Sequence, residues 1–329
     1  MKKNIIKVRN LKKDFLIKQK EDGFFGGIKS VFKPRYKTVE AVDNISFAVE
    51  EGELLSFIGP NGAGKSTTIK MLTGILYPSQ GEIKVLGINP QLQRQKLAFQ
   101  IGSVFGQKSQ LWYHLPPLDT YNLYAKIYEL DQKKYRTRLD FLVEQFEIAD
   151  LLKVPVRKLS LGQRMRCEIA ASLLHQPKIL FLDEQTIGLD VIAKQKIREV
   201  IRFLNEKEKV TIFLTSHDVG DIESLAKRTI IVNHGRIVFD DETRRLKERY
   251  VTKKIVELIF EQKAKKFEYP AGKVIERKEN RVKVEIDLQE KAIDKLLSFA
   301  VKNYDIIDMN VYDRPMEEII ADIYRQEDL

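Results

Sequence analysis

Residues suited to binding phosphate are concentrated in one glycine-rich stretch, Gly59-Pro60-Asn61-Gly62-Ala63-Gly64-Lys65-Ser66-Thr67. Its glycines let successive backbone N–H groups turn toward one anion, and a helix that starts directly after the stretch adds partial positive charge. Lys65 can reach the β- and γ-phosphates of a nucleotide, while the Ser66 hydroxyl can bind Mg²⁺. The stretch therefore predicts a phosphate-binding loop that holds a nucleotide with magnesium.

Two adjacent acids, Asp183 and Glu184, follow the continuous apolar run of residues 179–182. Such a run indicates a buried parallel strand, which presents side chains at its carboxyl end. Because adjacent side chains of a strand point to opposite faces, one acid can address magnesium while the other addresses a water molecule. A second apolar run, residues 210–215, ends in Ser216 and His217. This position at the mouth of a second strand favours a functional role for the histidine.

A helix start and a strand end supply further polar groups. Ser160 and Gly162 directly precede a helical pattern that we expect from Arg164 to about Leu174. A hydroxyl, backbone N–H groups and the helix dipole can there face one anion, although such a helix start by itself predicts only a cap. The strand expected over residues 101–107 ends in Gln107.

The elements that must position these residues alternate between strands and helices. A strand at residues 54–58 leads into the phosphate loop, and a helix follows the loop and stops by Pro78. From Leu118 to about Leu152, apolar residues recur at helical spacing and predict a helical subdomain. Other strands are expected at residues 1–16, as an edge strand, and at 42–49 and 82–87.

Length and composition indicate a soluble globular protein with one large and one small domain. The 329 residues are 32% charged and 43% hydrophobic. No apolar run approaches the roughly 20 residues of a membrane-spanning helix, and the first residues lack the apolar stretch of a signal peptide. We therefore expect a cytoplasmic protein. Cys167 is the single cysteine, which excludes an internal disulfide and a cysteine-based metal site.

The net charge is compatible with nucleic acid or anionic lipid as a partner, and equally with a surface whose charges are simply solvated. An excess of 57 basic over 47 acidic residues gives a net charge of +10, and the densest basic stretch, residues 17–37, also carries aromatic residues. This predicted basic insertion suits an anionic membrane surface or a partner protein, and a disordered insertion is an equal alternative. No basic and aromatic arrangement typical of a nucleic-acid module occurs, so no nucleic acid is expected.

Together these motifs resemble the nucleotide-binding subunit of an ABC transporter, and they occur in that family's order. The resemblance covers roughly residues 1–240. Its motifs are the phosphate loop at 59–67, Gln107, the signature segment at 159–163, Asp183 with Glu184, the loop Gly188-Leu189-Asp190, and His217. The basic insertion, residues 104–107 and the trailing domain resemble the drug-resistance exporter branch, including daunorubicin-exporter-like ATPases.

The resemblance implies an α/β fold: a P-loop NTPase core of the ABC ATPase type with antiparallel β and helical subdomains. The ABC ATPase domain is expected at residues 1–240, with the helical subdomain at about 108–175. A small α+β domain is expected at 241–329, where alternating apolar residues predict a strand near 282–288 and Pro315 opens a last helix. For this domain we prefer a regulatory or dimer-supporting role over that of a packing appendage.

The resemblance also implies a head-to-tail dimer of two copies, in which each ATP lies between the phosphate loop of one chain and the signature segment of the other. Phe15 and Tyr36 compete for the place of the aromatic residue that stacks on adenine. The remaining roles follow the family's motifs, with phosphate contacts from residues 59–67, Ser160, Gly162 and Gln163, Mg²⁺ ligation by Ser66, Gln107 and Asp183, polarisation of water by Glu184, and a γ-phosphate contact from His217.

The expected activity is ATP hydrolysis coupled to transport. We expect a peripheral protein on the cytoplasmic face of the membrane that, with separately encoded permease subunits, exports drugs or other hydrophobic or cationic compounds. An importer ATPase with a regulatory domain, or an ABC ATPase without a transport role, are the alternatives. Only one phosphate loop is found, which disfavours the translation-associated group with two cassettes in one chain.

Two positions depart from the family's pattern. Leu161 stands where the signature most often has glycine, and Gln185 stands where proline commonly follows the paired acids. Proline would fix φ and remove an N–H in the turn beyond Glu184, whereas glutamine restores both freedoms. We therefore predict that Gln185 slows hydrolysis without preventing ATP binding.

Overall fold

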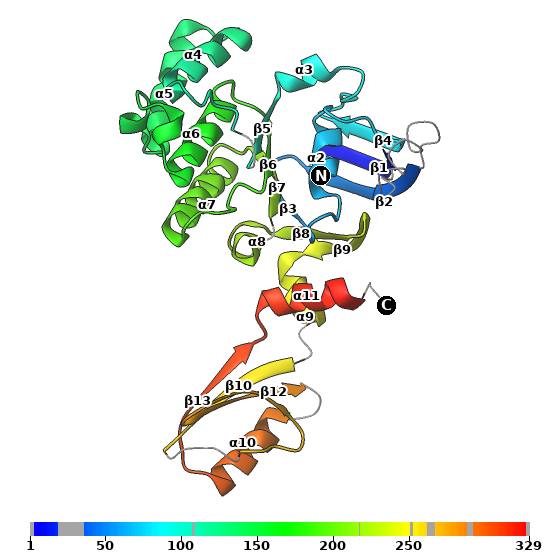
Figure 1. Cartoon of the computed structure of the whole chain (residues 1–329), viewed down its shortest axis with the longest axis vertical. Coiled ribbons are helices and arrows are strands. Elements are labelled where there is room, and N and C mark those ends of the chain that lie inside the picture. The colour runs from blue at the N-terminus through cyan, green and yellow to red at the C-terminus, as the bar shows by residue number, and fades with distance from the viewer. Residues whose placement is uncertain are drawn as a thin grey trace, which may run out of the picture. The chain divides into compact units, whose positions relative to one another are not determined.

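The computed structural model describes residues 3–18, 36–106, 109–216, 218–250, 253–261, 267–287 and 292–326. Most of the predicted basic insertion lies outside these ranges. The chain forms two compact units, Met1–Asp241 and Glu242–Leu329 (Figure 1). Within the described ranges, the first unit contains two sheets and two apolar clusters, and the second unit contains one sheet and one apolar cluster.

A six-stranded sheet with the order β5-β6-β7-β3-β8-β9 forms the centre of the first unit. Five of its strands, from β5 to β8, run parallel. Every residue of β3, β6 and β7 is buried, which explains why these strands appear in the sequence as continuous apolar runs. The strands are β3 (Leu54–Ile58), β5 (Ile101–Phe105), β6 (Ile179–Asp183), β7 (Thr211–Ser216), β8 (Arg228–Asn233) and β9 (Arg236–Glu242).

An antiparallel sheet of three strands, β2-β1-β4, belongs to the same unit. Its strands are β1 (Asn4–Lys18), β2 (Tyr36–Glu50) and β4 (Gln80–Val85). The prediction of an edge strand at residues 1–16 was wrong, because β1 is the middle strand and pairs with both β2 and β4. One of these partners, β4, follows the phosphate loop in the sequence. The alternation of apolar residues within β1 gives no information about so distant a neighbour.

Helices α4 to α7 gather on one side of the six-stranded sheet, whereas α2 lies between that sheet and the antiparallel one (Figure 1). The predicted helical subdomain contains α4 and α5, and the Asp131 side chain caps α5 by accepting hydrogen bonds from the backbone N–H groups of Lys133 and Lys134. Within the described residues no helix has the length and apolar character needed to cross a membrane. The helices of this unit are α2 (Lys65–Leu72), α3 (Arg94–Ala98), α4 (Pro117–Ile127), α5 (Gln132–Gln145), α6 (Leu161–Leu173), α7 (Val191–Glu206) and α8 (Val219–Leu225), with short 3₁₀ turns at Ala149–Leu151 and Val156–Lys158.

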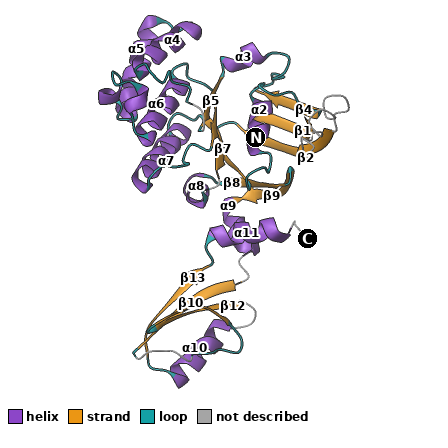
Figure 2. Cartoon of the chain, in the orientation of Figure 1, coloured by secondary structure: helices purple, strands orange, loops and turns teal. Residues whose placement is uncertain are grey.

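In the second unit an antiparallel sheet, β11-β12-β10-β13, packs one face against α10 (Figure 2). Val256, Leu258 and Phe260 of β10 form an apolar cluster with Leu296 and Ala300 of α10. The strand near 282–288 and the last helix occur as predicted, whereas β10 and β11 were missed. The elements are α9 (Thr243–Tyr250), β10 (Lys253–Phe260), β11 (Lys273–Lys278), β12 (Arg281–Asp287), α10 (Ala292–Asn303), β13 (Ile306–Asp313) and α11 (Met316–Gln326).

Candidate functional site

The register of the parallel strands aligns the carboxyl ends that carry the predicted motifs. Ile58 of β3, which leads into the phosphate loop, lies opposite Ser216 of β7. Thr215 lies opposite Asp183 of β6, and Asp183 lies opposite Phe105 of β5. The phosphate loop and both acids therefore meet at one edge of the sheet, as in other open α/β folds. Gln107 and His217 lie outside the described residues, so their roles remain predictions.

The phosphate loop requires glycine at its last turn. Gly64 has φ +100°, and a Cβ built on it would lie 2.3 Å from the carbonyl oxygen of Ala41. This residue is also the N-cap of α2, and no side chain among the described residues caps that helix. Because the first N–H groups of a helix have no partner within the helix, they can bind a phosphate at this position.

Lys65 is a buried cation within the loop, with 5% of its surface exposed. Its ammonium group donates to the carbonyl oxygens of Gly59, at 2.7 Å, and Pro60, at 3.1 Å. The Lys65 Nζ also lies 3.4 Å from Oε1 of Glu184. The lysine thus joins the phosphate loop to the second acid, and a phosphate bound in the loop would compete for the same ammonium group.

Oxygen ligands suited to Mg²⁺ surround the first acid. The Ser66 hydroxyl donates to Oδ1 of Asp183 at 3.1 Å, and the Thr215 hydroxyl donates to the same oxygen at 2.6 Å. Asp183 is 8% exposed and is the last residue of β6, so its carboxylate is buried at the carboxyl end of that strand. Mg²⁺ is typically bound by one or two carboxylates together with substrate phosphates, and Ser66 with Asp183 fits this set.

Glu184 begins the turn that follows β6. Its backbone has φ +57°, a conformation that glutamate seldom adopts, and its N–H donates to the carbonyl oxygen of Thr215 at 3.1 Å. The end of β5 is in close contact, since the N–H of Gly106 donates to the carbonyl oxygen of Asp183 at 2.8 Å. A Cβ on Gly106 would lie 2.3 Å from the carbonyl oxygen of Glu184, so the turn leaves no room for a larger residue there.

Gln185, one of the two departures from the family's pattern, points into the protein. Its side chain is buried, and its amide oxygen and nitrogen have no hydrogen-bond partner among the described residues. A buried amide without a partner costs about 1–3 kcal/mol. Proline at this position would carry no such amide.

The signature segment caps a helix with its own side chains. The Ser160 hydroxyl accepts a hydrogen bond from the N–H of Gln163, and the Gln163 side chain accepts one from the N–H of Ser160. Helix α6 starts at Leu161 rather than Arg164, because this reciprocal capping box begins the helix at Ser160. Gly162 therefore belongs to the first turn, where an added Cβ would lie 2.8 Å from Cβ of Ala193 on α7.

The other departure, Leu161, faces the loop between β6 and α7. Its Cδ2 lies 3.2 Å from the position that a Cβ would take on Gly188. Leu161 also packs against the apolar cluster of the helical subdomain. The side chain that replaces the usual glycine is thus accommodated within the same chain.

Phe15 and Tyr36, the two residues that could stack on adenine, lie at different distances from the phosphate loop along the antiparallel sheet. Phe15 of β1 pairs with Val39 of β2, two residues before Ala41, which contacts Gly64. Tyr36 precedes Ala41 by five residues on the same strand and is 60% exposed. Because a strand rises about 3.3 Å per residue, Tyr36 lies roughly 10 Å farther along the strand from this contact than Val39 does.

Comparison with known proteins identifies the family. The chain is 31% identical over 208 residues to the ABC transporter ATP-binding protein NatA of Bacillus subtilis, a match that covers 63% of this chain and 84% of NatA. The chain belongs to the ABC transporter family. The ABC transporter domain model matches residues 42–187, and the daunorubicin resistance ATP-binding protein DrrA3 of Streptomyces coeruleorubidus is 33% identical over 213 residues, or 65% of this chain and 67% of DrrA3.

A solved structure of the family has the same fold as the first unit. The dimeric structure of MJ0796, a bacterial ABC transporter cassette, matches with a TM-score of 0.60 and 25% identity over 73% of this chain and 99% of that one. The predicted family and the ABC ATPase fold are therefore confirmed. This ABC protein is an ATPase whose cofactors are ATP and Mg²⁺.

Sequence reasoning missed two features of the site. Thr215 appeared only as part of an apolar run, although a threonine before Ser216 and His217 at a strand end could have been recognised as polar. The ion pair between Lys65 and Glu184 joins residues far apart in the chain, and no local signal indicates it.

Proposed function

We propose that this chain is the ATP-hydrolysing subunit of an exporter, that it works as a head-to-tail dimer, and that it drives separately encoded membrane subunits. The capping box at Ser160 is the observation that supports the proposed dimer. The two hydrogen bonds between Ser160 and Gln163 stay within the segment, and the Ser160 hydroxyl accepts one of them while keeping a hydrogen to donate. An uncharged helix start with a donor hydroxyl suits the phosphate of an ATP held by a second copy.

Each residue of the candidate site has one task in this proposal. Lys65 and the amides of the phosphate loop neutralise phosphate charge, and Ser66 and Asp183, with Gln107, hold Mg²⁺, which neutralises charge on the β- and γ-phosphates when bound. Glu184 orients and polarises the attacking water, and His217 contacts the γ-phosphate. Phosphoryl transfer depends mainly on positioning and charge stabilisation, so these groups are sufficient.

Export is favoured by the kind of relative that the chain matches. DrrA3, 33% identical, is a daunorubicin resistance protein. Because an exporter needs a path across the membrane, the proposal includes separately encoded permease subunits and a location on the cytoplasmic face of the membrane. The membrane subunits would hold the transported compound, which we expect to be a hydrophobic or cationic molecule.

Ser160→Arg tests the dimer. The added cation fills the phosphate-facing helix start, so ATP-dependent dimerisation and turnover should be lost while the single chain still binds ATP. Light scattering, phosphate release and binding of a fluorescent ATP analogue measure the three properties. Ser298→Arg places the same change at an exposed position of α10 in the second unit and should leave all three unchanged. Loss of ATP binding by single Ser160→Arg chains, or normal turnover, would contradict a site completed by a second copy.

Reconstitution tests export. The chain would be purified with the membrane protein that co-purifies with it and placed in vesicles with the ATPase units outside. ATP should then drive a fluorescent hydrophobic cation into the lumen, and the Glu184→Gln variant should not support this uptake. ATP-driven loss of preloaded dye from the same vesicles would indicate import instead, and the absence of any membrane partner would exclude transport.

A further inference from the structure

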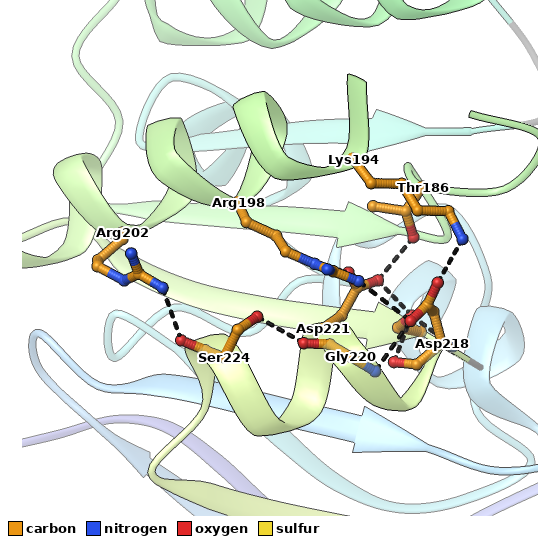
Figure 3. Close-up of polar contacts among 9 residues, drawn as sticks. Thr186, Lys194, Arg198, Arg202, Asp218, Gly220, Asp221 and Ser224 are labelled. Atoms are coloured by element: carbon orange, nitrogen blue, oxygen red, sulfur yellow. Dashed lines mark hydrogen bonds and ion pairs between the residues drawn. The ribbon is translucent and has the colours of Figure 1, made fainter. Parts of the chain in front are cut away.

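The buried carboxylate of Asp221 accepts hydrogen bonds from three different segments of the first unit. Asp221 lies on α8 and has no exposed surface. Its Oδ2 accepts hydrogen bonds from the hydroxyls of Thr186, at 2.6 Å, and Ser216, at 2.7 Å. Its Oδ1 accepts a hydrogen bond from Nε of Arg198 on α7 at 2.7 Å (Figure 3). We call these four residues the Asp221 cluster.

The donors of the cluster come from the segments that carry the proposed catalytic groups. Thr186 is two residues beyond Glu184, in the turn after β6, and Ser216 is the last residue of β7, directly before His217. Arg198 belongs to α7, the helix that follows the Gly188-Leu189-Asp190 loop and is capped by Asp190. The carboxylate of Asp221 therefore connects the turn that contains Glu184, the end of β7 and helix α7.

A second carboxylate, at the start of α8, reinforces this arrangement. Asp218 pairs with Lys194 and with Nη2 of Arg198, the latter at 3.1 Å, and accepts a hydrogen bond from the N–H of Gly220 at 2.9 Å. Burial alone would raise the pKa of Asp218, but the Lys194 and Arg198 charges lower it below its ordinary value. Arg198 thus lies between two carboxylates, as Figure 3 shows, which fixes α7 against the start of α8.

We propose that Asp221 is a positioning residue for ATP hydrolysis, which acts by fixing the Glu184 turn and the end of β7 relative to each other and to α7. The proposal rests on the roles proposed above for Glu184 and His217. Asp221 is bonded to their neighbours rather than to the reacting groups, so it controls where these groups lie and not the chemistry that they perform. Charge-assisted hydrogen bonds in a buried site have fixed geometry, and misplacement of a catalytic group by about 1 Å can lower a rate about 100-fold.

Variants of the hydroxyl donors separate positioning from folding. Thr186→Val keeps the side-chain shape and removes one hydrogen bond to Asp221, whereas Thr186→Ser keeps the hydroxyl. We expect Thr186→Val to lower kcat for ATP by about 10- to 100-fold with the KM changed less than about 3-fold, and Thr186→Ser to retain most of the activity. Asp221→Asn should lower kcat at least as much, and adding Thr186→Val to it should cause little further loss, because both changes break the same link.

Thr73→Val is the matched control. Thr73 is also buried, but its hydroxyl donates to backbone carbonyls at the end of α2, outside the Asp221 cluster. Thermal unfolding of each variant shows whether it is folded at the assay temperature. The proposal is overturned if folded Thr186→Val keeps the wild-type kcat, if Thr73→Val loses as much activity as Thr186→Val, or if the losses appear in KM alone. If Thr186→Val keeps the wild-type kcat while Glu184→Gln loses turnover in the same assay, the proposed role of Glu184 stands although the Asp221 cluster does not act in it.

Discussion

Replacement of Glu184 by glutamine should separate ATP binding from ATP hydrolysis. The substitution keeps the size of the side chain, and it removes both the charge that would polarise water and the ion pair with Lys65. Loss of one preorganised catalytic group typically lowers kcat by about 100- to 1000-fold, or about 2.7–4 kcal/mol. We therefore expect turnover of Glu184→Gln to fall by at least this factor.

The same substitution should tighten ATP binding. At 3.4 Å the attraction between Lys65 and Glu184 is about 5 kcal/mol for an effective dielectric constant near 20. Desolvation of the buried Lys65 and the partly buried Glu184 offsets most of this energy, and a remainder of roughly 1.4 kcal/mol would correspond to about a tenfold lower Kd. Without the carboxylate, the ammonium group of Lys65 no longer has to leave a charged partner in order to bind the phosphate, although its hydrogen bonds to the carbonyl oxygens of Gly59 and Pro60 remain.

Phosphate release and titration with a fluorescent ATP analogue measure the two effects in the purified chain. Glu208→Gln is the control, since it also breaks an ion pair, with Arg138 at 2.6 Å, in the helical part of the unit. It should alter neither kcat nor the Kd for ATP. Normal steady-state hydrolysis by Glu184→Gln would refute the role of Glu184, and an unchanged or weaker ATP affinity would refute its competition with phosphate for Lys65.

Three other predictions concern single residues. Gln185→Pro should raise kcat about 2- to 5-fold. Proline makes the turn stiffer, which lowers the entropy cost of ordering it by about 0.4–1 kcal/mol, and it carries no side-chain amide to be buried without a partner. An unchanged ATPase rate would disprove the loosening of this turn by Gln185. Phe15→Ala should weaken ATP binding more than Tyr36→Ala does, since Phe15 lies nearer to Gly64, and equilibrium binding of the two variants decides between them. Burial raises the pKa of Cys167 to about 11, so at pH 8 its thiolate fraction should be roughly 200-fold below that of an ordinary thiol. A colorimetric thiol reagent should accordingly react with the native chain far more slowly than with the unfolded chain, and equal rates would contradict the burial of this thiol.

The residues of the site could be predicted from the sequence better than the contacts between them. Residues 54–58 and 179–183 were recognised as strands because every residue in them is buried, and the predicted motifs follow those strands directly. The approach of Lys65 to Glu184 depends on the order β6-β7-β3, which no local pattern contains. The same holds for Asp221, whose partners are brought to it by three different elements.

The second unit shows a different limit of sequence patterns. In β12, strict alternation of apolar and charged residues matches one buried face, and the strand was predicted. In β10, Ile255 and Glu257 on the face opposite the apolar cluster are buried as well. The sequence of β10 therefore does not alternate between buried and exposed residues, and only the structure shows that this strand lies between β12 and β13.

The order of strands in the six-stranded sheet also bears on how the chain is made. Both neighbours of β3 are encoded far downstream, as Leu54 pairs with Ile212 and Leu55 with Arg228. At about 5–20 residues per second, a ribosome needs roughly 8–30 s to add the intervening segment. During that time the strand that ends in the phosphate loop has two unpaired edges and a largely apolar sequence. The nascent chain is therefore most exposed to aggregation before β7 emerges, and a chaperone that binds apolar segments would protect it during this interval.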